Sequence, residues 1–141
     1  MVLLGKSIER ALIEGMQAGN LYLDSSQKIT ASGIDGLKDL PTAVLAQDLE
    51  GRINYCNTMA CIRFGYSTNE FIGLSSVKLV PKNLHRARAE AFKRIIETGT
   101  PKEFKDSPRI KKGGETIKIT GYAFRYHLNG KPSIGAIVYP S

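Results

Sequence analysis

PTAVLAQDLEGRINYCNTMACIRFGYSTNEFIG, residues 41–73, carries the most informative pattern in this chain of 141 residues. Residues 42–46 form an apolar run of the kind that makes a short buried strand. The run ends at Asp-Leu-Glu-Gly, residues 48–51, where the aspartate can accept hydrogen bonds within a tight turn and the glycine supplies a positive φ. Residues 52–56 then alternate polar and apolar side chains, as a half-buried strand does. We therefore predict a hairpin over residues 42–56.

Two short helices are predicted after this hairpin. The first is capped by Asn57 and Thr58, ends at Gly65, and carries the apolar residues Met59, Ile62 and Phe64. The second begins at residues 67–70, Ser-Thr-Asn-Glu, which have the form of a capping box.

These motifs carry a resemblance to a known family. Residues 48–53, 55 and 57, followed by 64–67, 70, 72–73 and 80–81, resemble the signature of the PAS domain superfamily, and the match continues through 97–101 and 111–115 to the end of the chain. The resemblance implies an α+β fold, a five-stranded antiparallel sheet with short helices and one long helix on one face. It implies sensing and signalling but no particular ligand, because PAS domains sense many things on one scaffold.

Length and composition agree with one globular domain. The chain is 42% hydrophobic and 23% charged, which is ordinary globular usage. No apolar run approaches the ~20 residues that cross a bilayer, and the apolar start at residues 1–4 is too short for a signal peptide and lacks a basic segment before it. We therefore expect a cytoplasmic protein that does not bind membranes.

The two cysteines, Cys56 and Cys61, form no disulfide framework and no zinc or haem attachment motif. We interpret both as small buried hydrophobic residues. No cluster of His, Asp and Glu has the spacing of a metal site, so no metal is predicted.

The net charge of +7 suggests a nucleic-acid partner, because a basic field can bind phosphate in a salt-dependent way. The basic residues gather at 86–94 and 102–118. However, no helix-turn-helix or finger pattern accompanies them, and aromatic residues are not interleaved with them as stacking platforms. A solvated basic face is therefore favoured over a nucleic-acid site.

Residues 1–38 are predicted to form an N-terminal amphipathic helix and a connector, ahead of a PAS domain at residues 39–141. The helix has an apolar stripe at Leu4, Ile8, Leu12 and Met16. The resemblance implies that such a helix packs on the outer face of the sheet or pairs with its copy, and we predict both packing and a homodimer. The connector, residues 21–38, has room for a short strand or a helical turn.

Residues 81–98 are predicted to form the long helix, ended by Gly99. Three strands are expected after it, at 104–110, 115–128 and 133–139. The Asn-Gly pair at 129–130 makes the last two antiparallel neighbours. By resemblance the long helix lines the ligand cavity of PAS domains. The predicted cavity residues are Ile62, Leu79, Leu84, Arg88, Ala91, Phe92, Ile95 and Ile119.

Arg88 is the most informative of these residues. If it faces inward, a small carboxylate or another anion would satisfy its planar fork of donors. The alternative is that Arg88 extends to solvent or pairs with an acid of the chain such as Glu90 or Glu97.

No cofactor is predicted, although a haem- or flavin-dependent gas, redox or light sensor stays open as an alternative. In haem-binding sensors of the family that the chain resembles, a histidine stands at the position of Arg88, and arginine cannot bind iron. His85 is a candidate haem ligand only if haem is bound; His127 is the other histidine. Light-sensing flavin relatives need a cysteine at the position of Ser76, and redox flavin relatives usually have a tryptophan, which this chain lacks.

The sequence contains no nucleophile elbow and no glycine-rich phosphate loop, so no catalytic residues are predicted and the chain is not expected to be an enzyme. The predicted function is a sensory and regulatory PAS module that binds a small ligand or a protein partner and signals through a homodimer. An effector protein or a C-terminal output domain would then receive the signal. A cofactor-free dimerisation module of a transcription regulator or kinase remains the other alternative.

Overall fold

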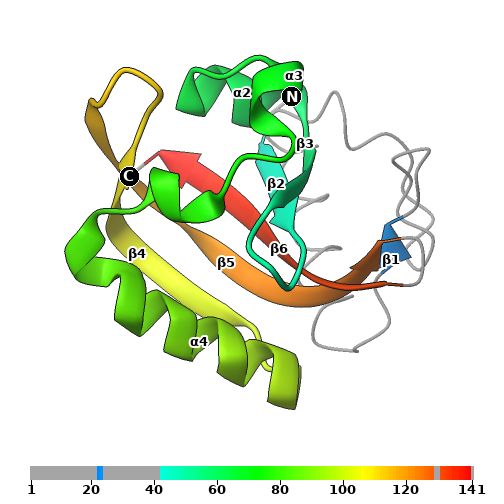
Figure 1. Ribbon diagram of the computed structural model, residues 1–141. Helices are drawn as coiled ribbons and strands as arrows, with labels where there is room; N and C mark the ends of the chain where they lie inside the picture. The colour runs from blue at the N-terminus through cyan, green and yellow to red at the C-terminus, as the bar shows by residue number, and fades with distance from the viewer. Residues whose placement is uncertain (1–21, 24–41, 129–130, 141) are drawn as a thin grey trace.

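The computed structural model describes residues 22–23, 42–128 and 131–140. It shows an α+β fold in which the helices lie over one face of a curved sheet (Figure 1). The predicted N-terminal helix, with Leu4, Ile8, Leu12 and Met16, lies outside the described residues, as do most of the connector and the Asn-Gly turn at 129–130.

The sheet contains the five antiparallel strands that were predicted: β2 (Ala43–Gln47), β3 (Ile53–Cys56), β4 (Lys102–Ile110), β5 (Thr116–Leu128) and β6 (Lys131–Pro140). Their spatial order is β4-β5-β6-β2-β3, and each neighbouring pair is antiparallel. Leu128 pairs with Lys131, so β5 and β6 are the antiparallel neighbours that the Asn-Gly pair predicts. In addition β1 (Tyr22–Leu23), within the predicted connector, pairs parallel to the end of β5.

The two short helices form as predicted. Helix α2 (Thr58–Phe64) is capped by Asn57 and ends at Gly65, whose φ of 81° a glycine adopts without strain. Helix α3 (Thr68–Phe71) begins with a complete capping box, in which Ser67 and Glu70 each accept a hydrogen bond from the other's backbone N–H.

The long helix differs from the prediction at its start. Residues 82–84 form a 3₁₀ turn, η3 (Lys82–Leu84), and the α-helix α4 (His85–Thr98) follows it. A second 3₁₀ turn, η2 (Ser76–Leu79), precedes Pro81. The proline has no backbone N–H and favours the start of a helix, so it marks the boundary between these turns. Gly99 ends α4 in a left-handed conformation, as predicted.

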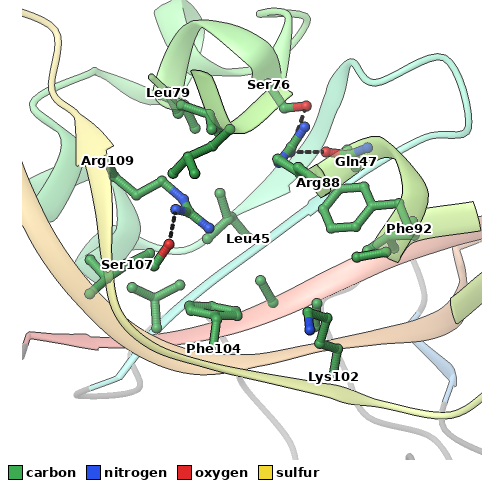
Figure 2. Close-up of a pocket in the computed structure, with 18 of the residues that line it drawn as sticks. Leu45, Gln47, Ser76, Leu79, Arg88, Phe92, Lys102, Phe104, Ser107 and Arg109 are labelled. Carbon is green, nitrogen blue, oxygen red and sulfur yellow. Dashed lines mark hydrogen bonds between the residues drawn. The ribbon is translucent and has the colours of Figure 1, made fainter. Parts of the chain in front are cut away.

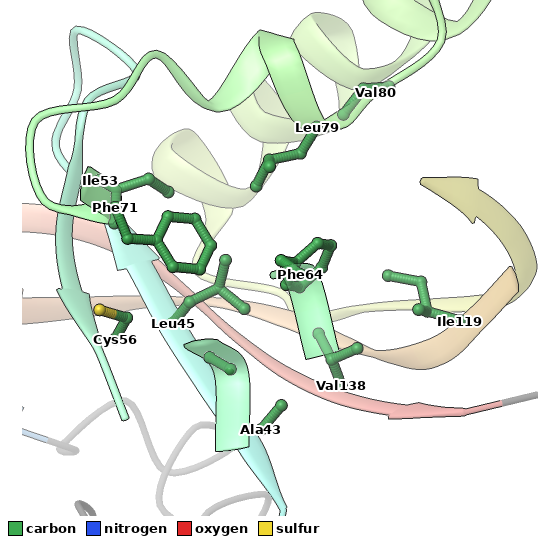
Figure 3. Packing of buried hydrophobic residues seen from close by; sticks show 11 residues of the cluster. Ala43, Leu45, Ile53, Cys56, Phe64, Phe71, Leu79, Val80, Ile119 and Val138 are labelled. Atoms are coloured by element: carbon green, nitrogen blue, oxygen red, sulfur yellow. The ribbon is translucent and has the colours of Figure 1, made fainter. Parts of the chain in front are cut away.

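The apolar core has two parts. The larger cluster lies beneath α2, α3 and η2 (Figure 3), and its phenylalanines Phe64 and Phe71 meet edge to face with ring centroids 5.8 Å apart. The smaller cluster joins Ile95 of α4 to Ala123 and Ile134 of the sheet. Phe104 of β4 packs against both clusters, and a cavity lined by described residues also borders both.

Candidate functional site

A cavity of about 200 Å³ lies between α4, η2 and the inner face of the sheet (Figure 2). Most of its lining is apolar, contributed by β2, β4, β5, β6 and α4. The polar and charged side chains at its wall are Gln47, Ser76, Arg88, Lys102, Ser107 and Arg109. An apolar pocket with a few polar groups is the usual form of a small-molecule site.

Arg88 faces this cavity from α4. Its Nη2 donates hydrogen bonds to Gln47 Oε1 at 2.8 Å and to Ser76 Oγ at 2.9 Å, and its guanidinium carbon lies 4.3 Å from the ring centroid of Phe92. Burial lowers the pKa of Arg88 to about 10, with a further contribution from the positive charge of Arg109. Arg88 therefore remains protonated at neutral pH, in a largely apolar cavity and with neutral partners.

The alternative ion pairs proposed for Arg88 do not form. Glu90 pairs with Arg86 and Glu97 pairs with Lys93 on the exposed side of α4, at 3.5 and 4.0 Å respectively. These acids pair with other basic residues, and Arg88 donates to Gln47 and Ser76 at the cavity. The alternative in which Arg88 extends to solvent or pairs with Glu90 or Glu97 is therefore not observed.

Arg109 is a second arginine at the same cavity, and it was not predicted from the sequence. Its Nη1 donates to Ser107 Oγ at 2.7 Å and to the carbonyl oxygen of Pro108 at 2.8 Å. Its guanidinium lies 5.3 Å from the ring centroid of Phe104, within the range of a cation–π contact. Burial lowers the pKa of Arg109 to about 10, so it too is protonated at neutral pH.

A β-bulge turns Arg109 toward the cavity. Phe104 pairs with Gly121 and Ser107 with Ile119, so two residues of β4 face one residue of β5 between these pairs. At the bulge Asp106 has a φ of 49°, in the left-handed region that aspartate tolerates better than most residues. The extra residue shifts the alternation of the strand, and consequently Phe104, Ser107 and Arg109 all line the cavity.

Six of the eight predicted cavity residues line the cavity in the structure. The residues that line the cavity are Leu79, Leu84, Arg88, Ala91, Phe92 and Ile119. Ile95, one turn further along α4, is buried in the smaller core cluster instead. Ile62 is 66% exposed, because α2 turns Ala60 and Phe64 inward and a residue midway between them points away.

His85 does not line the cavity. Its Nε2 lies 3.1 Å from the carbonyl oxygen of Val77 and 2.8 Å from that of Val80, so the ring nitrogen is placed to donate to the backbone of η2 and the residue after it. Ser76, which was noted only as a departure from flavin-binding relatives, is buried and holds Arg88. No sequence signal identified Gln47 as a cavity residue.

The two cysteines are both reduced, with the Cys56 and Cys61 sulfurs 3.7 Å apart. Cys56 is buried, as predicted, whereas Cys61 is only partly buried. Burial raises the pKa of the Cys56 thiol to about 12, with a smaller contribution from Cys61, so Cys56 is not a reactive thiolate at neutral pH.

Four basic side chains of the predicted basic face have acidic partners in the described structure. Besides the two pairs on α4, Lys111 lies 3.5 Å from Glu115 and Lys112 forms an ion pair with Glu70. Exposed pairs of this kind contribute little to stability, but they neutralise part of the positive field. In the part of the chain that the structure describes, no helix is long and apolar enough to cross a membrane, and no three potential metal ligands come together.

Comparison with known proteins gives a consistent picture of the fold. The family model described as PAS fold matches residues 35–135. Among curated protein sequences, none is similar enough to the chain to count as a relative.

Solved structures share this fold at low identity. The PAS domain of nitrogen regulation protein NR(II) from Vibrio parahaemolyticus is 17% identical, with a TM-score of 0.63, over 74% of this chain and 94% of that one. The PAS domain of an HTR-like protein from Haloarcula marismortui is 18% identical, with a TM-score of 0.63, over 74% and 84%. Drosophila melanogaster Cycle PAS-B with bound ethylene glycol is 14% identical, with a TM-score of 0.62, over 70% and 99%.

Proposed function

This chain belongs to the PAS fold family, and from that membership we propose that it is a sensory and regulatory module, without catalytic activity, that binds a small organic carboxylate beneath α4. The same fold occurs in the PAS domains of a nitrogen regulation protein and of a two-component sensor histidine kinase, which supports a role in signalling. Function on this scaffold depends on the individual site, so the ligand is argued from the cavity.

The observation that carries the proposal is a protonated guanidinium in a cavity with neutral partners. Arg88 donates hydrogen bonds to Gln47 and Ser76 from one terminal nitrogen, Nη2. Arginine presents its remaining donors in a planar fork that fits a carboxylate with two parallel hydrogen bonds. The apolar walls lower the local dielectric constant, which strengthens such an interaction.

The contacts of Arg88 also offer a route for the signal. Through its two hydrogen bonds it joins α4 to β2 at Gln47 and to η2 at Ser76. Strand β2 lies between β3 and β6 in the sheet. A carboxylate that changes the hydrogen bonding of Arg88 would therefore act on the sheet, and we propose that the sheet relays the change to a second copy, an effector protein or an output domain.

We propose that the ligand is a small metabolite and that the domain binds no cofactor. An apolar cavity of about 150 Å³ holds one benzene molecule, so about 200 Å³ suits a slightly larger molecule, and haem or flavin would have to displace lining side chains. The only described histidine side chain near the site, His85, is directed at backbone carbonyls. A visible absorption band that survives gel filtration would favour the haem or flavin alternative.

Isothermal titration with short monocarboxylates and dicarboxylates tests the proposal. At least one of them is expected to bind the wild-type protein, and Arg88→Gln should weaken that binding about 10-fold or more, the worth of a charged hydrogen-bonded contact. Arg86→Gln is the matched control, because Arg86 lies on the same helix with its side chain 93% exposed. Equal binding by the Arg88→Gln and wild-type proteins would overturn the proposal, and so would the absence of binding by any carboxylate. A concentration-dependent dimer that binds none of them would favour the dimerisation module.

A further inference from the structure

We infer that the cavity takes an organic dianion, two carboxylates joined by a short apolar spacer, with Arg88 holding one carboxylate and Arg109 the other. This inference rests on the proposed carboxylate site at Arg88 and adds to it a second anchor and a ligand class. It follows from three features of the cavity: its charge, its unused donors and its apolar middle.

The first feature is an uncompensated double positive charge. Arg88 and Arg109 line the same cavity, and neither forms an ion pair with any residue that the structure describes. The two charges interact, since Arg109 contributes to the lowered pKa of Arg88. Two like charges in one partly desolvated cavity are unfavourable, and a ligand with two negative charges would compensate both.

The second feature is the set of guanidinium N–H donors that no described residue accepts from. Within the described residues, Arg88 donates only from Nη2 and Arg109 only from Nη1. Each guanidinium therefore keeps a second terminal nitrogen and its Nε for a ligand. Since all of the present acceptors are neutral oxygens, the carboxylates of a ligand would be the strongest acceptors in the cavity.

The third feature is the apolar space between the two arginines. Figure 2 shows Arg109 reaching in from β4 and Arg88 from α4, with Leu45 of β2 between them. The rings of Phe92 and Phe104 flank the arginines. The Phe92 ring centroid lies 4.3 Å from the guanidinium carbon of Arg88, and the Phe104 ring centroid lies 5.3 Å from that of Arg109. A spacer of a few methylene groups suits this apolar wall. A polar spacer would instead lose its hydrogen bonds to water without gaining others.

Lys102 strengthens the preference for an anion. It is an exposed residue that also borders the cavity. A positive charge at the border of a cavity raises the local concentration of anions and their rate of entry. Inorganic phosphate would match the charge of the two arginines but would leave the apolar wall without a partner.

Calorimetric titration with two matched series tests the inference. The dicarboxylates are succinate, glutarate and adipate, and the monocarboxylates of equal carbon number are butyrate, valerate and hexanoate. At least one dicarboxylate is expected to bind about 10- to 100-fold more tightly than its partner, because it adds one charged hydrogen-bonded contact. Arg109→Gln should remove this advantage, lowering dicarboxylate affinity by far more than monocarboxylate affinity.

Two further variants separate a ligand contact from a loss of folding. Lys105→Gln removes a charge from an exposed position of the same strand and should change neither affinity. Arg109→Lys keeps the charge without the planar fork, so it should retain part of the dicarboxylate preference. The thermal midpoint of each variant shows whether it is folded.

The outcomes distinguish this inference from the proposed function. If Arg88→Gln abolishes binding while Arg109→Gln leaves dicarboxylate affinity unchanged, the site takes a single carboxylate, and the dianion inference is overturned alone. If inorganic phosphate binds as tightly as the best dicarboxylate, the apolar spacer has no role and the inference is again overturned. If neither series binds, both the inference and the proposed function are overturned.

Discussion

The inner face of the sheet is filled in two different ways, beneath α2 and α3 on one side and beneath α4 on the other. Under the short helices, Phe71 is 0% exposed and packs among aliphatic side chains, and Phe64, 1% exposed, packs against it and forms part of the cavity wall (Figure 3). Under α4 the same face borders a cavity of about 200 Å³ with two arginines at its wall (Figure 2). A filled core contributes apolar burial and dispersion, whereas a cavity with buried charges gives up part of both. The first region therefore stabilises the domain, and the second is available for a ligand.

Each region also contains a polar residue with little exposure, Asn57 in the first and Arg88 in the second, and the two differ in how many of their hydrogen bonds are made within the protein. Asn57 accepts hydrogen bonds from Val44 N and Ala60 N and donates one to the carbonyl oxygen of Thr42, all within the fold. It caps α2 and joins that helix to β2, so its hydrogen bonds are structural. Arg88, by contrast, lines the cavity and donates to described residues from one terminal nitrogen only, so its other donors are available to a ligand.

The largest effect is expected from truncation of the filled region. Phe71→Ala should lower the free energy of unfolding by about 3–5 kcal/mol, the usual cost of removing a buried aromatic ring. Phe92→Ala should cost less, because Phe92 is only partly buried and already borders a cavity. Urea denaturation of both variants measures the difference. Equal losses would mean that the two regions contribute alike to stability, which would remove the distinction between them.

Asn57→Ala is expected to lower the free energy of unfolding by about 2–4 kcal/mol. This sum combines the loss of a helix cap with the cost of leaving Val44 N and the Thr42 carbonyl oxygen buried without Asn57. Asn57→Ser is the matched variant, since a serine hydroxyl can still cap Ala60 N but is too short to serve Val44 N and the Thr42 carbonyl oxygen as well. Denaturation should place it between wild type and alanine. A serine variant as unstable as alanine would show that the bonds to Val44 and Thr42 dominate over the helix cap.

The contrast between the regions also separates what the sequence predicts well from what it does not. The capping box at residues 67–70 and the glycine that ends α2 are local signals, and the structure confirms them. The orientation of a helix depends on what packs against it, and for this reason Ile62 was wrongly placed at the cavity. Arg109 was missed because the bulge at Asp106 reverses the alternation of β4. That bulge is set by pairing with β5, which a reading of β4 alone does not include.

A smaller effect is expected from Arg88→Met. Removing the buried charge relieves its desolvation cost, while Gln47 and Ser76 each lose a hydrogen bond from Arg88. These contributions oppose each other, and the free energy of unfolding should change by no more than about 1 kcal/mol. Urea denaturation at neutral pH gives the value. A loss of about 3 kcal/mol or more would make Arg88 a structural residue like Asn57 and would weaken the case for its role in binding.

The smallest effect is expected at the surface of the filled region, where Glu70 joins α3 to the turn between β4 and β5. The pKa of Glu70 is lowered to about 2 from an ordinary value of 4.5, chiefly by its hydrogen bond with Lys112 and then by those with Ser67. Because the folded protein holds the carboxylate ionised, its contribution to stability is fully present above about pH 4.5 and is lost as the pH falls toward 2.

Glu70→Gln should therefore reduce the slope of stability against pH within that acidic window. Its effect at neutral pH should be small, because both partners are exposed and solvent screens their attraction. Glu115→Gln, which removes another exposed acid near the same turn, serves as the control. Thermal unfolding of the three proteins from neutral to acidic pH makes the comparison. Since Lys112 N also donates to the Phe64 carbonyl oxygen, an unchanged slope would mean that this backbone bond alone holds the turn against α2.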